Sequence, residues 1–161
     1  MAHSTSSTTI KVISNAGEVK KEIMDALRKG MTIIGLQAES YAKQACPVDT
    51  GLLRNSITYA IGGEVTHIGV YADDKGGNKG RYEGSAPADE EGVITLYVGT
   101  NVSYAPCVEL GHAQQPGRYV PAIGKRLKAS FVQGKPFLRQ AMEGHAQEYH
   151  TILSNELNKI K

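Results

Sequence analysis

The chain has 161 residues, of which 40% are apolar, and a formal net charge of +2. A chain of this size can bury roughly 70% of the surface that it exposes when unfolded, so we expect one globular domain over residues 1–161 that needs neither a metal nor a disulfide. No apolar run approaches the roughly 20 residues of a membrane span, and the start, Met1 to Thr9, is polar instead of resembling an apolar signal sequence. We therefore expect a protein made and folded in a cytoplasm, with residues 1–13 flexible and no membrane partner.

A long amphipathic helix is predicted before residue 47, because apolar and small residues recur at steps of three and four. The predicted inward face consists of Val19, Ile23, Ala26, Gly30, Ile33, Gln37, Tyr41 and Ala45. Pro47 ends this helix, since proline disfavours helical geometry in the preceding residue and has no backbone donor. In the turn that follows, Asp49 and Thr50 can accept hydrogen bonds from nearby amides, and Gly51 can take a positive φ.

Strand periodicity replaces helical periodicity after this turn. Residues 55–61 alternate as a half-buried strand should. Gly62 and Gly63 then predict a two-residue hairpin, which leads into a return strand over residues 64–71. A third strand is predicted over residues 93–99, and no fourth strand is evident.

Two long irregular segments are predicted, at residues 72–92 and 111–134. The first is rich in glycine and charged residues and too polar to form a core, so we expect it to be mobile in the free protein. Beyond the second segment, Pro136 suits the first position of a closing helix, and residues 138–160 continue at helical spacing.

The second segment belongs to a stretch of unusual charge. No acidic residue occurs from Leu110 to Met142, whereas basic residues are frequent. This basic stretch contains Arg118, Lys125, Arg126, Lys128, Lys135 and Arg139. The asymmetry allows contact with nucleic acid, an acidic protein partner or solvent. A dedicated nucleic-acid reader is not favoured, because helix-turn-helix, zinc and aromatic-platform motifs are missing from the sequence.

The sequence contains no convincing catalytic pattern. His145, Glu148 and His150 do not follow the spacing of a helical zinc site. Cys46 and Cys107 match no metal or redox spacing, and we expect both to be buried thiols. A binding or structural role without a cofactor or metal is therefore expected in place of enzymatic activity.

Three segments carry a resemblance to a known family: Pro47 to Ile57, Val98 to Gly111, and Lys135 to Ala141. Their order and spacing resemble those of minor structural proteins of long-tailed bacteriophages, of the neck or tail-completion type. The resemblance covers roughly residues 15–155. The chain departs from the pattern at His112, where threonine is often found, and at Gln140, where proline is common.

The resemblance implies an α+β fold with a long N-terminal helix, a small curved, mostly antiparallel sheet and a C-terminal helix. It also implies a virion protein that forms a ring, with six-fold symmetry favoured, at the junction of head and tail. Its neighbours there would be head-closure or connector proteins and tail tube or tail terminator proteins. DNA would lie nearby without a dedicated binding site, and a nucleic-acid-binding accessory protein that uses the basic stretch is the alternative.

Within the second segment, a short helix is expected to begin near Tyr104 with Ser103 as its cap and to end at Gly111. Glu109 could reach the amides of residues 49–51, pair with Arg54, or remain an exposed carboxylate. The interface and structural candidates are Asp49, Thr50, Gly51, Arg54, Tyr104, Glu109, Gly111, Arg118, Lys125, Arg126, Lys128, Lys135, Pro136 and Phe137. We expect the two long loops to supply the contacts between subunits.

Overall fold

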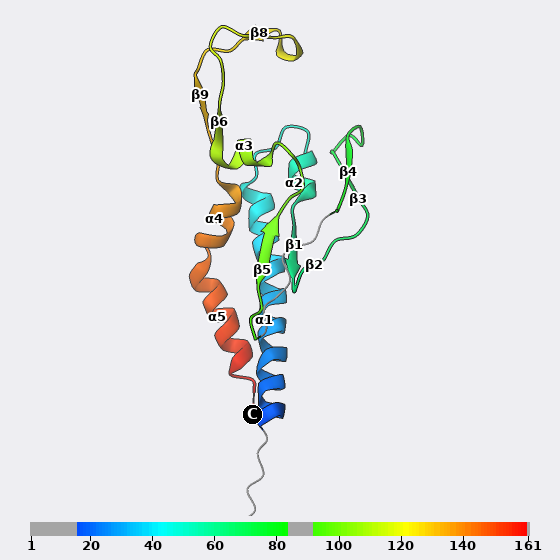
Figure 1. Ribbon diagram of the computed structural model, residues 1–161, viewed down its shortest axis with the longest axis vertical. Coiled ribbons are helices and arrows are strands. Elements are labelled where there is room, and N and C mark those ends of the chain that lie inside the picture. The colour runs from blue at the N-terminus through cyan, green and yellow to red at the C-terminus, as the bar shows by residue number, and fades with distance from the viewer. Residues whose placement is uncertain (1–15, 84–91, 161) are drawn as a thin grey trace, which may run out of the picture.

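The computed structural model describes residues 16–83 and 92–160 and has the predicted α+β architecture (Figure 1). In chain order the elements are α1 (Ala16–Ala45), α2 (Leu52–Ser56), β1 (Thr58–Ile61), β2 (Glu64–Val65), β3 (Val70–Ala72), β4 (Lys79–Arg81), β5 (Leu96–Gly99), α3 (Ala105–Leu110), β6 (Gly111–Ala113), β7 (Tyr119–Val120), the 3₁₀ turn η1 (Pro121–Ile123), β8 (Lys125–Arg126), β9 (Phe131–Gln133), α4 (Phe137–Glu143) and α5 (Ala146–Leu157). Helix α1 is the axis of the molecule and contacts α4 and α5 as well as β1 and β5. Residues 1–13, predicted to be flexible, lie outside the described residues.

Helix α1 ends before Pro47 as predicted, but its predicted inward face is only partly right, since Tyr41 and Ala45 pack against the first buried cluster while other members of the stripe are exposed. The buried residues are Gly30, Ile34, Gly35, Ala38, Glu39 and Ala42. Only Gly30 belongs to the predicted stripe, and Val19 is 47% exposed. The reason is that α1 is covered from two directions, by the sheet and by the C-terminal helices. Small residues occupy the arc where both neighbours come close, so the most hydrophobic stripe is not the buried one.

The strand predictions are partly right. Gly62 and Gly63, with φ of 65° and 85°, form the predicted hairpin between β1 and β2. Strand β5 pairs antiparallel with β1, which gives a sheet of order β2-β1-β5. The predicted strand over residues 55–61 begins too early, because residues 52–56 form α2. The predicted return strand over residues 64–71 is also wrong, since β2 stops at Val65 and β3 pairs with β4 instead.

Residues 72–81, predicted to be irregular, are part of the β3–β4 hairpin. The carboxylate of Asp73 organises its turn by accepting hydrogen bonds from the backbone N–H groups of Lys75, Gly77 and Asn78 at 2.8–3.1 Å. These bonds, the one from Asn78 first, lower the pKa of Asp73. Residues 84–91 of the predicted loop lie outside the described part of the chain, so the expected mobility of residues 72–92 stays a prediction.

Residues 111–134 are also not irregular, and we call them the arm. Strands β6 and β9 form a two-stranded antiparallel ribbon, and β7 and β8 pair beyond it, with η1 at the turn. Figure 1 shows the arm leaving α3, extending away from the helices and bending over near its tip. The sequence did not reveal these strands because each has only two or three residues, too few for a period of two to be recognised. We call the remaining described part of the chain the body.

The predicted single C-terminal helix is two helices, α4 and α5, with a break at Gly144 and His145. The hydroxyl of Tyr149 donates to the carbonyl oxygen of Ala141 at 2.7 Å and so satisfies an acceptor near the break. Burial raises the pKa of Tyr149 to about 12. The ring of His145 stacks on Tyr41 with 3.5 Å between the ring centroids, which joins the break to α1.

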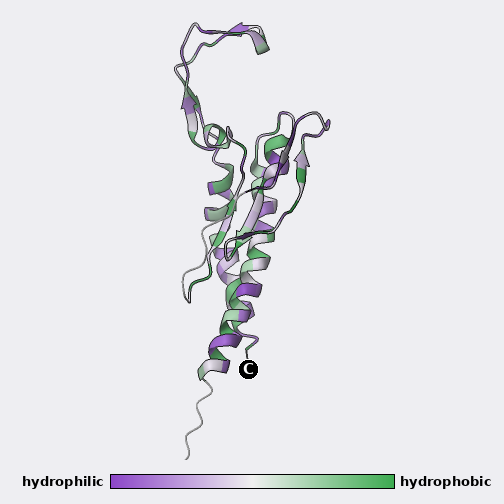
Figure 2. Ribbon diagram, turned by 45° about the vertical axis from the view of Figure 1, so that its right-hand side comes forward, coloured by the Kyte–Doolittle hydropathy of each residue, from purple (hydrophilic) through white to green (hydrophobic). Residues whose placement is uncertain are grey.

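The body contains two neighbouring buried clusters. The first consists of Ala42, Cys46, Leu53, Ile57, Tyr71, Val102, Ala105, Phe137 and Ala141, and the second of Ile34, Ala38 and Tyr149. Tyr41 and Val98 pack against both. Cys46 is buried as predicted, but Cys107 is exposed on α3, so that prediction was wrong. Figure 2 shows apolar residues in the arm as well, outside both clusters.

Candidate assembly site

The three segments that carry the family resemblance meet at one end of the body. Leu53 and Ile57 of the first, Ala105 of the second and Phe137 of the third all belong to the first buried cluster. The hydroxyl oxygens of Ser56 and Thr100 are 2.5 Å apart, which adds a polar link between the first two segments. The segments are therefore one structural unit, and the arm leaves the body from this unit.

Glu109 joins α3 to α4. Its two carboxylate oxygens accept hydrogen bonds from the backbone N–H groups of Leu138 and Arg139, each at 3.0 Å. These are among the first N–H groups of α4, which have no partner within the helix, and a carboxylate is favoured at this end of a helix. The predicted contacts of Glu109 with the turn at residues 49–51 and with Arg54 are wrong. Arg54 instead pairs with Asp74 at 2.7 Å.

The first and last residues of the arm pack closely against each other at a pair of glycines. Gly111 ends α3 as predicted and has a φ of 84°. A Cβ atom there would lie 2.5 Å from the carbonyl oxygen of Val132, and one on Gly134 would lie 2.5 Å from the nitrogen of Gly111. Lys135 N–H donates to the carbonyl oxygen of Val108 at 2.7 Å, directly beside this crossing. Side chains would not fit here, so the glycines let the arm begin from a tightly packed base.

The start of α3 differs from the prediction. Tyr104, and not Ser103, is the residue at its N-terminal boundary, and no side chain caps it. Pro106 lies in the first turn as expected, where a missing N–H costs no helical hydrogen bond. The hydroxyl of Thr100 accepts from the N–H of Val102 at 3.1 Å and so orders the turn before the helix.

The surface of the arm combines apolar and basic side chains. Tyr119, Ile123 and Phe131 are 52%, 58% and 51% exposed. The guanidinium of Arg126 lies over the ring of Tyr119, 5.9 Å from its centroid, and donates to the carbonyl oxygen of Gly117 at 2.7 Å. The predicted residues Arg118, Lys125, Arg126 and Lys128 all lie in the arm and are exposed, whereas Lys135 lies at its base. A two-stranded ribbon has no core of its own, so these apolar side chains remain available to a partner.

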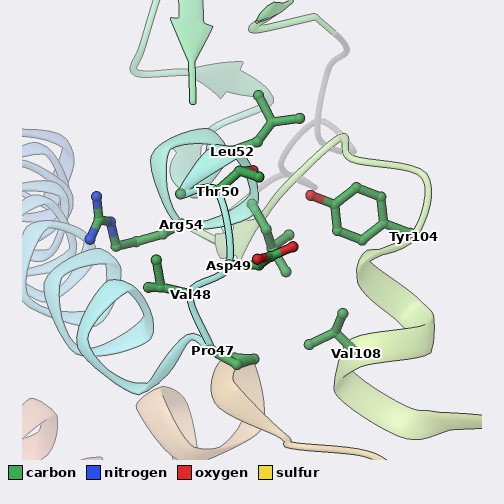
Figure 3. A pocket seen from close by; sticks show the side chains of 10 residues that line it. Pro47, Val48, Asp49, Thr50, Leu52, Arg54, Tyr104 and Val108 are labelled. Atoms are coloured by element: carbon green, nitrogen blue, oxygen red, sulfur yellow. The ribbon is translucent and has the colours of Figure 1, made fainter. Parts of the chain in front are cut away.

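A groove lies beside the base of the arm (Figure 3). Its volume is about 280 Å³. Figure 3 shows Tyr104 and Val108 on one side of the groove, facing the turn that contains Pro47 and Asp49 on the other. Burial, with smaller contributions from Cys46 and Asp49, raises the pKa of Tyr104.

The turn of the first segment that forms one wall of the groove has the predicted glycine geometry. Gly51 has a φ of 86°, as expected. Helix α2 begins directly after Gly51 without a side-chain cap, so the hydrogen bonds expected from nearby amides to Asp49 do not form at the start of this helix. Asp49 and Thr50 instead line the groove.

The candidates from the sequence thus divide between the body and the arm. Gly51, Glu109, Gly111, Pro136 and Phe137 belong to the unit that holds the arm, and Phe137 is 1% exposed. Sequence reasoning missed Val48, Tyr119, Ile123 and Gly134. The signal for Gly134 was available, because it and Gly111 are the two ends of the predicted irregular segment 111–134.

The described residues contain no group of three His, Cys, Asp or Glu side chains placed to hold a metal ion. His145 and Glu148 approach to 3.3 Å, and Glu148 also accepts from the hydroxyl of Tyr41, so this cluster connects α1 to α5. No described helix is both long and apolar enough to cross a membrane.

Comparison with known families identifies the class of protein. Residues 8–111 match the family model described as "Bacteriophage HK97-gp10, putative tail-component". The chain therefore belongs to this family of phage tail components, and the resemblance to phage tail and neck proteins is confirmed. The match ends at Gly111, where the arm begins. No curated protein and no solved structure shows a significant match.

Proposed function

We propose that this tail component forms a ring at the junction of head and tail and joins two structures assembled beforehand. The observation that carries the proposal is the arm, which presents exposed apolar and basic residues far from the buried clusters. A closed ring needs a contact between two different surfaces of the same chain. An arm on one side of a subunit and a groove in its body supply two such different surfaces.

The neighbours in this proposal are head-closure or connector proteins on one side and tail tube or terminator proteins on the other. Six-fold symmetry is the expectation, as the family resemblance implies. The basic stretch would speed the approach to an acidic partner, because complementary charge acts mainly on the rate of association. Salt should then slow joining more than it reduces the final number of joined particles.

A phage that lacks this gene tests the proposal. We expect it to accumulate unjoined heads and tails, and purified protein should restore joining without nucleotide or metal. A variant in which a two-residue Asn-Gly turn replaces residues 112–133 should fold but fail to restore joining, since the arm lies outside the buried clusters. Normal infectious virions from the deletion would refute the assembly role. A strict need for ATP or a divalent ion would point instead to an enzyme.

Nucleic-acid binding is the second candidate, and the pairing of Arg126 with Tyr119 in an acid-free arm favours it. Affinity for DNA would then fall steeply with rising salt, because bound phosphates release counterions. The same arm deletion should abolish that binding. Joining that proceeds equally well with DNA-free particles would exclude this candidate.

A further inference from the structure

We propose that the tip of the arm of one subunit docks in the groove of the next copy of the same chain. This inference rests on the proposed ring and names the two surfaces that close it. The tip is formed by η1 with β7 and β8, and the groove lies between α3 and the turn after Pro47.

The groove suits side chains of a protein partner. Its volume of about 280 Å³ is slightly below the roughly 300–1,000 Å³ typical of small-molecule pockets. Its walls include Val48, Leu52 and Val108, and Val48 is 51% exposed. The tip offers Ile123 and Tyr119, both more than half exposed. One or two such side chains from the tip would cover apolar surface on both partners.

Charge favours the tip over other surfaces of the chain. Arg54 and Asp49 are the charged residues that line the groove. The charge of Arg54 is offset by its ion pair with Asp74 at 2.7 Å, whereas the carboxylate of Asp49 does not cap helix α2. The groove therefore presents a carboxylate at its edge. The tip carries Lys125 and Arg126, both exposed, with the exposed Arg118 directly before it, and it contains no acidic residue. Opposite charges thus surround apolar contacts on the two surfaces, an arrangement typical of protein interfaces.

The occupant belongs to another copy, because the arm does not reach the groove of its own chain. No arm residue lines that groove. The crossing at Gly111 and Gly134 fixes the direction in which the arm leaves, and Figure 1 shows its tip held away from the body. A two-stranded ribbon with apolar residues on its surface is marginal alone and gains stability from a partner.

Disulfide trapping tests the docking directly. In a Cys107→Ser background, which removes the exposed native thiol, Val48→Cys and Ile123→Cys are introduced together and the phage gene is replaced. Mild oxidation of joined particles should yield a ladder of covalent oligomers that ends at the ring size. The matched control pairs Ile123→Cys with Val70→Cys, which is 59% exposed on β3, and should give monomers. Equal ladders from both pairs, or none from the first, would overturn the docking.

Charge reversal gives an independent readout. Asp49→Lys and Lys125→Glu should each weaken self-association by up to about fivefold at low salt, and the double variant should recover most of the loss. Ile123→Ala should weaken it by about fivefold or more, as for a buried anchor of an interface. If the double variant instead shows the sum of the two single losses of self-association, the proposed pairing of Asp49 with Lys125 is wrong. If joined particles contain a ring but the thiols do not link, the docking proposal is wrong and the ring proposal is unaffected. A single copy of the protein at the junction would contradict both proposals.

Discussion

The body and the arm of this protein place the same kinds of residues in opposite environments. The chain contains two phenylalanines, of which Phe137 is 1% exposed in the body and Phe131 is 51% exposed in the arm. Phe137 is enclosed because α1, α2, α3 and α4 all contribute to its cluster. Phe131 belongs to a ribbon that has no second layer to cover it. An apolar residue therefore stabilises the fold in the body and remains available for assembly in the arm.

The largest expected effect is the difference in unfolding free energy between alanine variants of these two phenylalanines. Phe137→Ala should lower the free energy of unfolding by about 3 to 5 kcal/mol, because it leaves a cavity in the buried cluster. Phe131→Ala should change it by no more than about 0.5 kcal/mol, as expected for an exposed position. Urea denaturation of the purified variants measures both values. Similar losses for the two variants would show that the arm shares the cooperative core of the body.

A pair of glycines gives a smaller contrast. Gly51 in the body and Gly117 in the arm have nearly the same φ, 86° and 83°. Gly51→Val should cost about 1 to 3 kcal/mol, because valine is strained at this positive φ and its Cβ would clash with the carboxylate of Asp74. Gly117→Val meets no atom within 4 Å, and the arm can relax locally without unfolding the body. An equal shift of the urea midpoint for both variants would contradict this local relaxation.

The sequence correctly predicted the helix ends and turns whose geometry is set by residues close together in the chain. The end of α1 before Pro47, the Gly62–Gly63 hairpin and the end of α3 at Gly111 are of this kind. The buried face of α1 was not predictable in the same way. It depends on where β1 and α5 come close to the helix, and that approach is possible because Gly35 and Ala38 are small.

In the candidate site, too, contacts between residues far apart in the sequence were not predictable. Glu109 was recognised as a residue of interest, but its partners Leu138 and Arg139 lie across the whole arm in sequence. Such a contact follows from the fold of the arm, whose strands of two or three residues are too short to be recognised as strands in the sequence. The residues proposed for docking, Val48 and Ile123, have no motif that distinguishes them from core residues, and their exposure distinguishes them only in the structure.

The joint between arm and body gives a third prediction. Glu109→Ala should lower the free energy of unfolding by about 0.5 to 2 kcal/mol, the range for loss of a helix cap, because two N–H groups of α4 lose their acceptor. Glu143→Ala, at the exposed last residue of α4, is the matched control and should change stability little. Because α4 packs on α1, amide exchange should become faster in the first turn of α4 in the Glu109 variant. Unchanged exchange there would show that the carboxylate does not hold the helix.

The smallest effect concerns the β3–β4 hairpin, a second two-stranded ribbon that, unlike the arm, packs into the first buried cluster through Tyr71 and has a turn ordered by a carboxylate. Hydrogen bonds to the ionised form hold the pKa of Asp73 below its ordinary value of 3.8. A lowered pKa in the folded state stabilises the protein above the ordinary value, and this stabilisation is lost as the pH falls through the folded value. Asp73→Asn should therefore be less stable than the wild type at neutral pH, and the difference should shrink as the pH falls below about 4.

Urea midpoints across this pH range measure the difference in stability, with Asp25→Asn on the exposed surface of α1 as the charge-matched control. A difference between wild type and Asp73→Asn that stays constant with pH would mean that the ionised carboxylate does not order this hairpin, and the contrast with the arm would then need another cause.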